Sequence, residues 1–144
     1  RPPRSTLFPY TTLFRSTEGI HYSFDKKRLL VQNGYVQYIP EGMPELKGLH
    51  IMRSGWFLGE LKKKRFEPSG AFARGLTPDV CDKVIAYPGD SEEVVRYLKC
   101  ETLQVDPNLK NGWYLICVDE FALGWGKVSN GTLKNKYPSG WRLV

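Results

Sequence analysis

The sequence has few of the residues from which metal and catalytic sites are built. It contains two distant histidines, His21 and His50, and three cysteines without paired spacing, Cys81, Cys100 and Cys117. A structural zinc site needs a full set of clustered ligands, and disulfides persist only in oxidising compartments. We therefore expect no metal site. We expect the cysteines to be buried free thiols of a cytoplasmic protein, rather than disulfides or zinc ligands.

Nucleotide-binding and nucleophile motifs are also absent. Gly124-Trp125-Gly126 is not followed by a glycine at the position that a dinucleotide-binding fingerprint requires, and no Gly-Lys-Ser/Thr phosphate loop occurs. No serine or cysteine lies in a nucleophile motif. Four acids occupy expected helix caps and turns, where they have structural roles: Glu92, Glu93, Asp119 and Glu120. We predict that this chain has no catalytic residues and no cofactor of its own.

Long apolar segments are missing too. No run approaches the roughly 20 residues that a membrane-spanning helix needs, and no signal peptide is recognisable. The 144 residues, of which 41% are hydrophobic and 25% charged, are typical of one globular domain. We expect a protein that does not bind membranes.

The N-terminal segment distorts the charge balance. Residues 1–16 contain three arginines and no acid, so the net charge of +6 falls to +3 for the remainder. Thr-Leu-Phe occurs twice in this segment, and Thr6 to Ser16 resembles the translation of a common sequencing adapter. We interpret residues 1–16 as non-native. The alternative is an authentic flexible extension. If the segment is non-native, we expect the natural chain to begin further upstream.

A remnant of an upstream domain is predicted next. Residues 29–31 and 35–39 are apolar or alternating, and they flank Asn33-Gly34, a strong hairpin signal. A linker with two prolines follows. We interpret residues 17–46 as this remnant with its linker, and residues 47–144 as the main domain.

The main domain begins with a second predicted hairpin. Residues 49–53 alternate, Ser54-Gly55 predicts a turn, and residues 56–61 return as a strand. This strand leads into Lys62-Lys63-Lys64-Arg65, the most basic run of the chain. Ser69 then caps a short predicted helix.

Two further helices are predicted from their start signals. Thr77-Pro78-Asp79 has a cap, a first-turn proline and an acid, and predicts a helix that ends near Tyr87. Residues 90–93 have capping-box spacing for the next helix. The expected inward residues are Val80, Val84 and Ile85 in the first helix, and Val94, Val95 and Leu98 in the second.

The remaining segments are mostly strands. Residues 102–105 alternate, residues 113–118 form an apolar run typical of a buried central strand, and residues 121–128 follow as a strand. Residues 129–135 predict a short helix or turn, and residues 138–142 a last strand. This order predicts an α+β fold, a small mixed β-barrel with short inserted helices, rather than alternating βαβ units.

The strand at residues 121–128 carries two glycines on one face. Gly124 and Gly126 lack side chains, so another backbone can approach closely there. The sequence leaves two interpretations open. The bare face receives a phosphodiester chain beside the lysines that follow, or it only lets a neighbouring part of the protein pack.

Three segments resemble a known family. Residues 47–55, 58–69 and 123–138 are similar to the C-terminal PUA-like domain of RsmF-type (Sun/Nop family) rRNA cytosine 5-methyltransferases. The similarity covers residues 47–142, and residues 21–46 resemble the end of the preceding intermediate domain. The resemblance implies an RNA-binding barrel that docks rRNA, or the small ribosomal subunit, for a methyltransferase domain that uses S-adenosylmethionine.

The catalytic features of that family are missing here. Its active-site cysteines occur in Pro-Cys and Thr-Cys dipeptides, whereas Val80, Lys99 and Ile116 precede the three cysteines of this chain. The resemblance therefore implies that the methyltransferase domain lies N-terminal to this region. We expect any rRNA cytosine 5-methyltransferase activity to belong to the parent protein, and we expect the upstream methyltransferase domain of the same parent chain to be a partner of this region.

The predicted RNA site is a groove with two cationic edges. One edge is Lys62, Lys63, Lys64 and Arg65, and the other contains Lys127, Asn130, Lys134 and Lys136. Trp125 or Tyr137 is expected to stack on an unpaired base. Alternatively, the run at residues 62–65 protects a sheet edge from pairing, and Trp125 belongs to the core.

The sequence leaves two other functions open. The chain is a docking module that packs on the methyltransferase domain without touching RNA, or it is a stand-alone RNA-binding protein. The docking module predicts exposed apolar surface and no retention of RNA. The genomic sequence upstream of Thr17 separates a truncated enzyme from a stand-alone protein.

Overall fold

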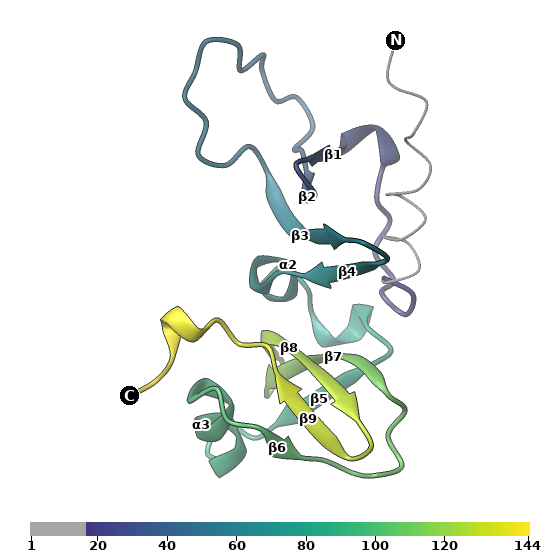
Figure 1. Cartoon of the computed structure of the whole chain (residues 1–144), viewed down its shortest axis with the longest axis vertical. Helices are drawn as coiled ribbons and strands as arrows, with labels where there is room; N and C mark the ends of the chain where they lie inside the picture. The colour runs from purple at the N-terminus through teal and green to yellow at the C-terminus, as the bar shows by residue number, and fades with distance from the viewer. Residues whose placement is uncertain (1–16) are drawn as a thin grey trace. The chain divides into compact units, whose positions relative to one another are not determined.

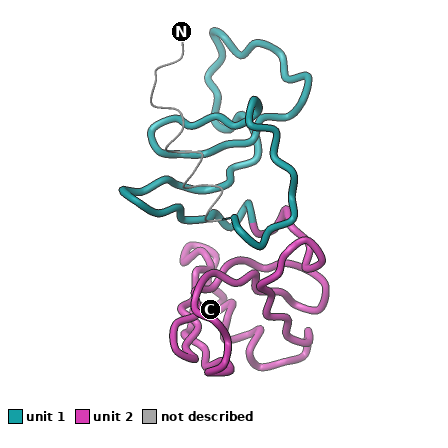
Figure 2. The backbone as a smooth tube through the Cα atoms, turned by 90° about the vertical axis from the view of Figure 1, so that its right-hand side faces the viewer, with its two compact units in different colours: residues 1–72 teal, residues 73–144 magenta. Residues whose placement is uncertain are grey.

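The computed structural model describes residues 17–144, so the segment interpreted as non-native lies outside the described residues. Figure 2 shows two compact units, of which the first ends at Phe72 and the second begins at Ala73. Each unit has its own sheet. The domain boundary expected at residue 46 lies in a loop between two strands of the first sheet, because the N-terminal hairpin pairs with the strand that follows this loop. None of the helices in residues 17–144 has the length and apolar character needed to cross a membrane.

The first unit is a four-stranded antiparallel sheet whose strands follow chain order (Figure 1). A 3₁₀ turn, η1 (Lys26–Arg28), precedes strands β1 (Leu29–Gln32), β2 (Tyr35–Tyr38), β3 (Trp56–Lys62) and β4 (Arg65–Pro68). The β1–β2 hairpin is confirmed. Asn33 and Gly34 have φ of 52° and 81°, as the two central residues of a type I′ turn require.

The second expected hairpin is wrong. Residues 49–53 form no strand, and β3 pairs with β2 and β4 instead. Leu49 and Met52 are exposed, whereas Leu58 of β3 and Val36 of β2 are fully buried. Pairing with β2 lets β3 bury its apolar side chains. Pairing with residues 49–53, which are nearer in sequence, would not bury them.

Aromatic rings fill the core of the first unit. The ring centroids of Phe24 and Tyr38 are 5.3 Å apart, and those of Trp56 and Phe72 are also 5.3 Å apart, within the range of favourable ring pairs. Helix α2 (Gly70–Arg74) begins as expected, because the Phe72 amide donates a hydrogen bond to Ser69 Oγ at 3.0 Å.

The second unit is a mixed five-stranded sheet in the order β5-β7-β8-β9-β6 (Figure 1). The strands are β5 (Val84–Tyr87), β6 (Leu103–Gln104), β7 (Gly112–Val118), β8 (Phe121–Ser129) and β9 (Thr132–Asn135). Only β5 and β7 run parallel among the described pairs. The short helices are η2 (Pro78–Val80), α3 (Glu92–Leu98) and η3 (Ser139–Trp141). The predicted α+β class, with strands dominating and short helices between them, is confirmed.

Two local predictions in this unit are wrong, and the prediction of a short helix or turn at residues 129–135 is right only for the turn. The helix expected from Thr77 is only the single turn η2, because the β-branched run of β5 pairs with the buried strand β7. Residues 129–135 form a hairpin turn and β9, since Asn130 and Gly131 adopt left-handed φ of 49° and 79°. The last expected strand is η3, which Pro138 precedes without an N–H group for a strand ladder.

Helix α3 is confirmed, with a different buried face. Val94 and Tyr97 are buried, whereas Val95 is exposed. The helix packs on a core that contains Tyr97, Leu103, Tyr114, Ile116, Val128 and Leu133. The expectation of a central strand at residues 113–118 is confirmed, because β7 lies between β5 and β8 and is buried from Tyr114 to Cys117.

The two glycines of β8 face this core. A Cβ atom at Gly124 would lie 2.7 Å from the Tyr97 hydroxyl oxygen, and one at Gly126 would overlap Leu133 Cδ1. The glycines therefore make room for Tyr97 and Leu133. The packing interpretation is right, and the interpretation of a bare face open to RNA is wrong.

The three cysteines are free thiols, as expected. Cys117 is fully buried, whereas Cys81 and Cys100 are half-buried. Burial, with a smaller contribution from Asp79 and Asp82, raises the pKa of Cys81 to about 11. Burial also raises the pKa of Cys117 to about 11. Both thiols are protonated at neutral pH, which does not suit a nucleophile.

Candidate nucleic-acid interface

The outer face of the second sheet, opposite the glycines, carries a cationic patch. Trp113 of β7, Lys127 of β8 and Lys134 of β9 lie directly opposite one another in register. Lys136 lies two residues beyond Lys134 and next to Trp125, whose carbonyl accepts a hydrogen bond from the Lys136 amide at 3.2 Å. Because side chains alternate along a strand, these four residues share one face. We call Trp113, Lys127, Lys134 and Lys136 the outer patch.

The lysines of the outer patch surround an aromatic ring. The Nζ atoms of Lys127 and Lys136 lie 5.9 Å and 5.7 Å from the centroid of the Trp113 ring, within cation–π range. All three lysines are exposed. Within residues 17–144, none of them forms an ion pair with an acid.

Such a cluster of like charges destabilises the free protein. Lys127 and Lys134 are direct cross-strand neighbours, an arrangement in which like charges repel. An anion bound at the outer patch relieves this repulsion, and phosphate groups are the natural candidates. The geometry thus suits a polyanion.

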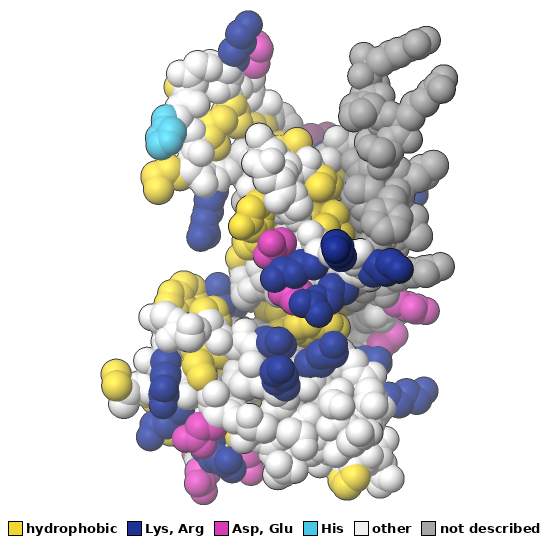
Figure 3. All heavy atoms as spheres, in the orientation of Figure 1, with side chains coloured by type: hydrophobic (Ala, Val, Ile, Leu, Met, Phe, Trp, Pro, Cys, Tyr) yellow, Lys and Arg dark blue, Asp and Glu magenta, His cyan; other side chains and the backbone are white. Residues whose placement is uncertain are grey.

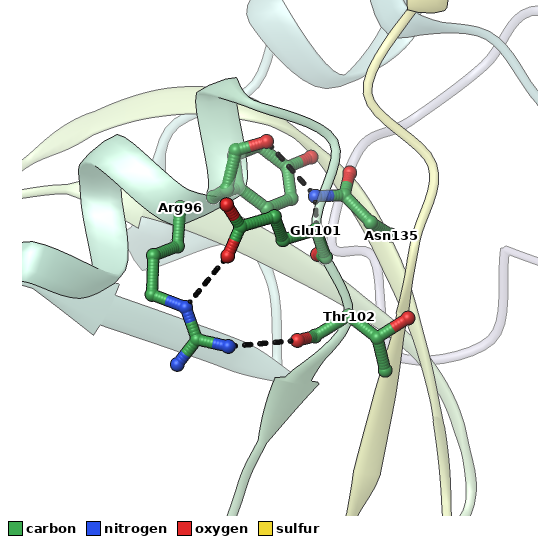
Figure 4. A network of polar contacts seen from close by, with 5 residues as sticks. Arg96, Glu101, Thr102 and Asn135 are labelled. Carbon is green, nitrogen blue, oxygen red and sulfur yellow. Dashed lines mark hydrogen bonds and ion pairs between the residues drawn. The ribbon is translucent and has the colours of Figure 1, made fainter.

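The strands beneath the outer patch are held by helix α3 (Figure 4). Asn135 Nδ2 donates to the carbonyls of Tyr97 and Glu101 at 2.8 Å and 2.9 Å. Arg96 Nε donates to Glu101 Oε2 at 2.8 Å, and its Nη2 donates to the Thr102 carbonyl at 3.3 Å. The end of α3 is thereby tied to β9, the strand that presents Lys134.

A buried hydrogen bond fixes β8 in the same way. The Tyr97 hydroxyl donates to the Trp125 carbonyl at 2.8 Å, and burial raises the pKa of Tyr97 well above its usual range. The hydroxyl therefore stays protonated and remains a donor. Lys127 follows Trp125 by two residues, so this bond positions the strand that presents Lys127.

The predicted stacking role of Trp125 is wrong. Its side chain is only 4% exposed, so neither face of the ring is available to a base. Tyr137 is half-buried, with its ring centroid 5.5 Å from that of Tyr97, and its predicted role stays a prediction.

Asn130 has a structural role in the β8–β9 turn. It adopts left-handed φ in the β8–β9 turn, and its amide donates to Asn111 Oδ1 at 2.9 Å. Asparagine is favoured at such positions. A contact between Asn130 and RNA stays a prediction.

The basic run of the first unit differs from the outer patch. Lys63 and Lys64 form the turn of the β3–β4 hairpin, whereas Lys62 and Arg65 lie 3.3 Å and 3.1 Å from Glu67 carboxylate oxygens. Figure 3 shows acidic side chains among the basic ones over this hairpin. Because β4 is a sheet edge, these charges also suit protection against edge pairing. The two predicted edges of the groove belong to different units, and the groove stays a prediction.

Trp113 was not among the residues expected from sequence. The sequence predicts Trp113 within a buried central strand, but it is half-buried. The lysines that approach its ring come from β8 and from the position directly after β9. The sequence signal for an accessible Trp113 is its place at the start of the apolar run, where a strand emerges from the core. Trp113 is the cross-strand partner of Lys127, so its side chain lies on the same face of the sheet as that exposed lysine.

The remaining titratable side chains of the described residues do not cluster around a metal position. Within residues 17–144, no group of three or more histidines, cysteines or acids is placed to hold a metal ion. The two thiols with raised pKa are protonated, and His21 and His50 are exposed and distant in sequence. The outer patch offers cations and an aromatic ring.

Two family models match the chain. Residues 14–76 match the RsmF rRNA methyltransferase first C-terminal domain, and residues 85–143 match the methyltransferase RsmF PUA domain. No curated protein gives a significant match. The matches follow each other in the order of the two compact units, and together they cover most of the described chain. The chain therefore carries two C-terminal domains of the RsmF-type rRNA methyltransferases, the first C-terminal domain and the PUA domain.

Proposed function

We propose that this region binds rRNA through the outer patch and thereby holds the substrate of a methyltransferase. The observation that carries the proposal is the gathering of Lys127, Lys134 and Lys136 without an acidic partner among the described residues. Repelling cations weaken the free protein, so their arrangement is explained by a bound anion. The family supports rRNA as that anion, because its name describes rRNA methyltransferases.

The binding is expected to depend weakly on sequence. Lysine ammonium groups contact phosphates as point charges, and such contacts position RNA without reading its bases. Each phosphate contact releases counterions, so affinity falls steeply with salt. The basic run at residues 62–65 contributes less, because Glu67 already neutralises part of its charge.

The decisive experiment replaces Lys127, Lys134 and Lys136 by alanine. We expect RNA affinity at low salt to fall at least about tenfold, and the slope of log affinity against log salt to become shallower by about 2 to 3. Fluorescence anisotropy with labelled single-stranded RNA measures both quantities. The matched control replaces three exposed lysines of the first unit, Lys26, Lys27 and Lys47.

Thermal unfolding of the same variants separates binding from folding. Removal of the repulsion between Lys127 and Lys134 should leave the second unit at least as stable as in the wild type. Loss of RNA binding without loss of stability supports the proposal. An unchanged salt slope, or an equal effect of the control triple, refutes it.

A second function is favoured by the first unit. A pocket of about 420 Å³ lies against the outer face of β1 and β2, and its lining includes Leu30, Ile39, Leu46, Ile51 and Met52. Met52 is 89% exposed and Leu49 is 66% exposed. Clustered exposed apolar side chains are typical of docking surfaces. We propose that this surface, the apolar pocket, packs on the methyltransferase domain of the same family.

Charge substitution tests this docking. Replacing both Ile51 and Met52 by glutamate should weaken binding of a separately produced RsmF-type methyltransferase domain at least about tenfold, because each carboxylate that docking buries loses its hydration. Isothermal titration calorimetry measures the affinity. RNA binding at the outer patch should remain unchanged. Equal binding by the variant and the wild type contradicts docking at the apolar pocket.

S-adenosylmethionine, the methyl donor that the family resemblance implies, is not expected to bind here. The described sheets lack a glycine-rich turn between a parallel strand and a helix, the site at which nucleotide cofactors bind in α/β folds. The protonated thiols of Cys81 and Cys117 do not fit a methyl-transfer nucleophile. We propose that a methyltransferase domain supplies the cofactor site and the chemistry, in the cytoplasm.

A further inference from the structure

We infer that Trp113 is a stacking platform for an unpaired RNA base, and that the outer patch therefore prefers single-stranded RNA to duplex RNA. This inference rests on the proposed function and adds the class of RNA. A flexible single strand can place a base on an aromatic ring while its flanking phosphates meet cations. A duplex keeps its bases stacked on one another and offers only its backbone.

The geometry places an aromatic ring and cations at matching positions. Lys127 on β8 and Lys136, which directly follows β9, bring their ammonium groups within 6 Å of the centroid of the Trp113 ring. A base on this ring would have its neighbouring phosphates beside these ammonium groups. Lys134 extends the row beyond Lys127 and would meet the next phosphate along the strand.

The Trp113 ring is accessible to a base, whereas the Trp125 ring is not. Trp113 is half-buried, whereas Trp125 on the adjacent strand is buried. Within residues 17–144, the one enclosed side-chain polar atom without a hydrogen bond is Ser91 Oγ. The indole N–H of Trp113 has no hydrogen-bond partner among the described residues and is not fully enclosed, so it can donate to RNA.

Other aromatic rings of the second unit fit less well. Phe121 is exposed, but it lies at the opposite end of β8, six positions and roughly 20 Å from Lys127. One face of Trp141 is covered by the Arg74 guanidinium, 4.4 Å from the ring centroid. Trp113 alone among these rings lies beside lysines of the outer patch.

The test compares Trp113→Ala with Trp113→Phe in the full chain of 144 residues. The probes are a single-stranded RNA of about 12 nucleotides and a hairpin duplex of similar length. We expect Trp113→Ala to weaken single-strand binding at least about fivefold and to leave duplex binding unchanged. Trp113→Phe retains a ring and should keep most of the affinity. Trp141→Ala, which removes an exposed tryptophan of the same unit, should change neither.

The slope of log affinity against log salt distinguishes base stacking on Trp113 from phosphate binding by the three lysines. Trp113→Ala should keep the wild-type slope, because it removes no charge, whereas the triple lysine variant flattens the slope. If the wild type binds RNA and Trp113→Ala binds both probes as the wild type does, stacking is refuted and the proposed function stands. Equal losses on both probes, or failure of Trp113→Phe to retain affinity, also refute stacking. If the wild type binds neither probe, the proposed function itself fails.

Discussion

Replacement of Gly59 by alanine should destabilise the first unit by roughly 3–5 kcal/mol, the sum expected from overpacking and backbone strain. A Cβ atom there would overlap the Glu67 carbonyl oxygen and lie 2.6 Å from Phe66 Cζ. The carbonyl belongs to the paired strand β4, so it cannot move without breaking the ladder. Gly59 also has φ of 156° and follows a register shift between β2 and β3. Chemical denaturation monitored by tryptophan fluorescence measures the loss.

Gly48→Ala is the matched control. Gly48 has φ of 80°, but a Cβ atom would meet nothing within 4 Å, so the expected cost is only about 1 kcal/mol from the left-handed conformation. A loss at Gly59 no larger than that at Gly48 would show that the β3–β4 contact is looser than the structure indicates. RNA binding by the outer patch gives a second readout, since the patch belongs to the other unit.

Tyr97→Ala should destabilise the second unit by about 3–5 kcal/mol, the usual cost of removing a large buried aromatic side chain. Tyr97 is fully buried in the core and donates to the Trp125 carbonyl. Its loss leaves a cavity under β8 and releases the strand that presents Lys127. RNA affinity should therefore fall together with the melting temperature, in contrast to the triple lysine variant.

Tyr97→Phe separates the contribution of the hydroxyl to stability from that of the ring. The Trp125 carbonyl still accepts from the Lys136 amide, so we expect a loss of only about 1 kcal/mol. Gly124→Ala should be destabilising in the wild type, because the new Cβ atom meets the Tyr97 hydroxyl oxygen, and nearly neutral when Tyr97 is phenylalanine. A double-mutant cycle measures this coupling. Additive effects would contradict the packing of Tyr97 against Gly124.

The local signals that succeeded were those in which a few adjacent residues set the backbone. Asn33-Gly34 specified its hairpin because both residues accept left-handed φ. Ser69 specified the start of α2 through one hydrogen bond to the backbone. Asn130-Gly131 also adopts left-handed φ and forms a hairpin turn, as Asn33-Gly34 does, and the strand that follows this turn replaces the helix alternative. These elements need no distant partner.

The predictions that failed depended on a partner far along the chain. The helix start at Thr77 is locally favourable, but β5 gains a ladder with β7, whose Leu115 pairs with Val84 across 31 positions. Strand β3 likewise selected β2 instead of the nearer residues 49–53. Long-range pairing outweighs weak local propensity, because it buries apolar side chains and satisfies backbone groups at once.

By itself, the sequence determined the strand-rich α+β class, the family, the free thiols and the lysines that β8 and β9 present. Tertiary structure alone decided which face of β8 is interior. A period of two residues assigns Gly124 and Trp125 to opposite faces, but it does not say what will cover either one. Tyr97 and Leu133 arrive from other elements to fill the glycine face. Lys127, Lys134 and Trp113 were therefore left together on the other face, where hydration of the ammonium groups keeps that part of the sheet open to solvent.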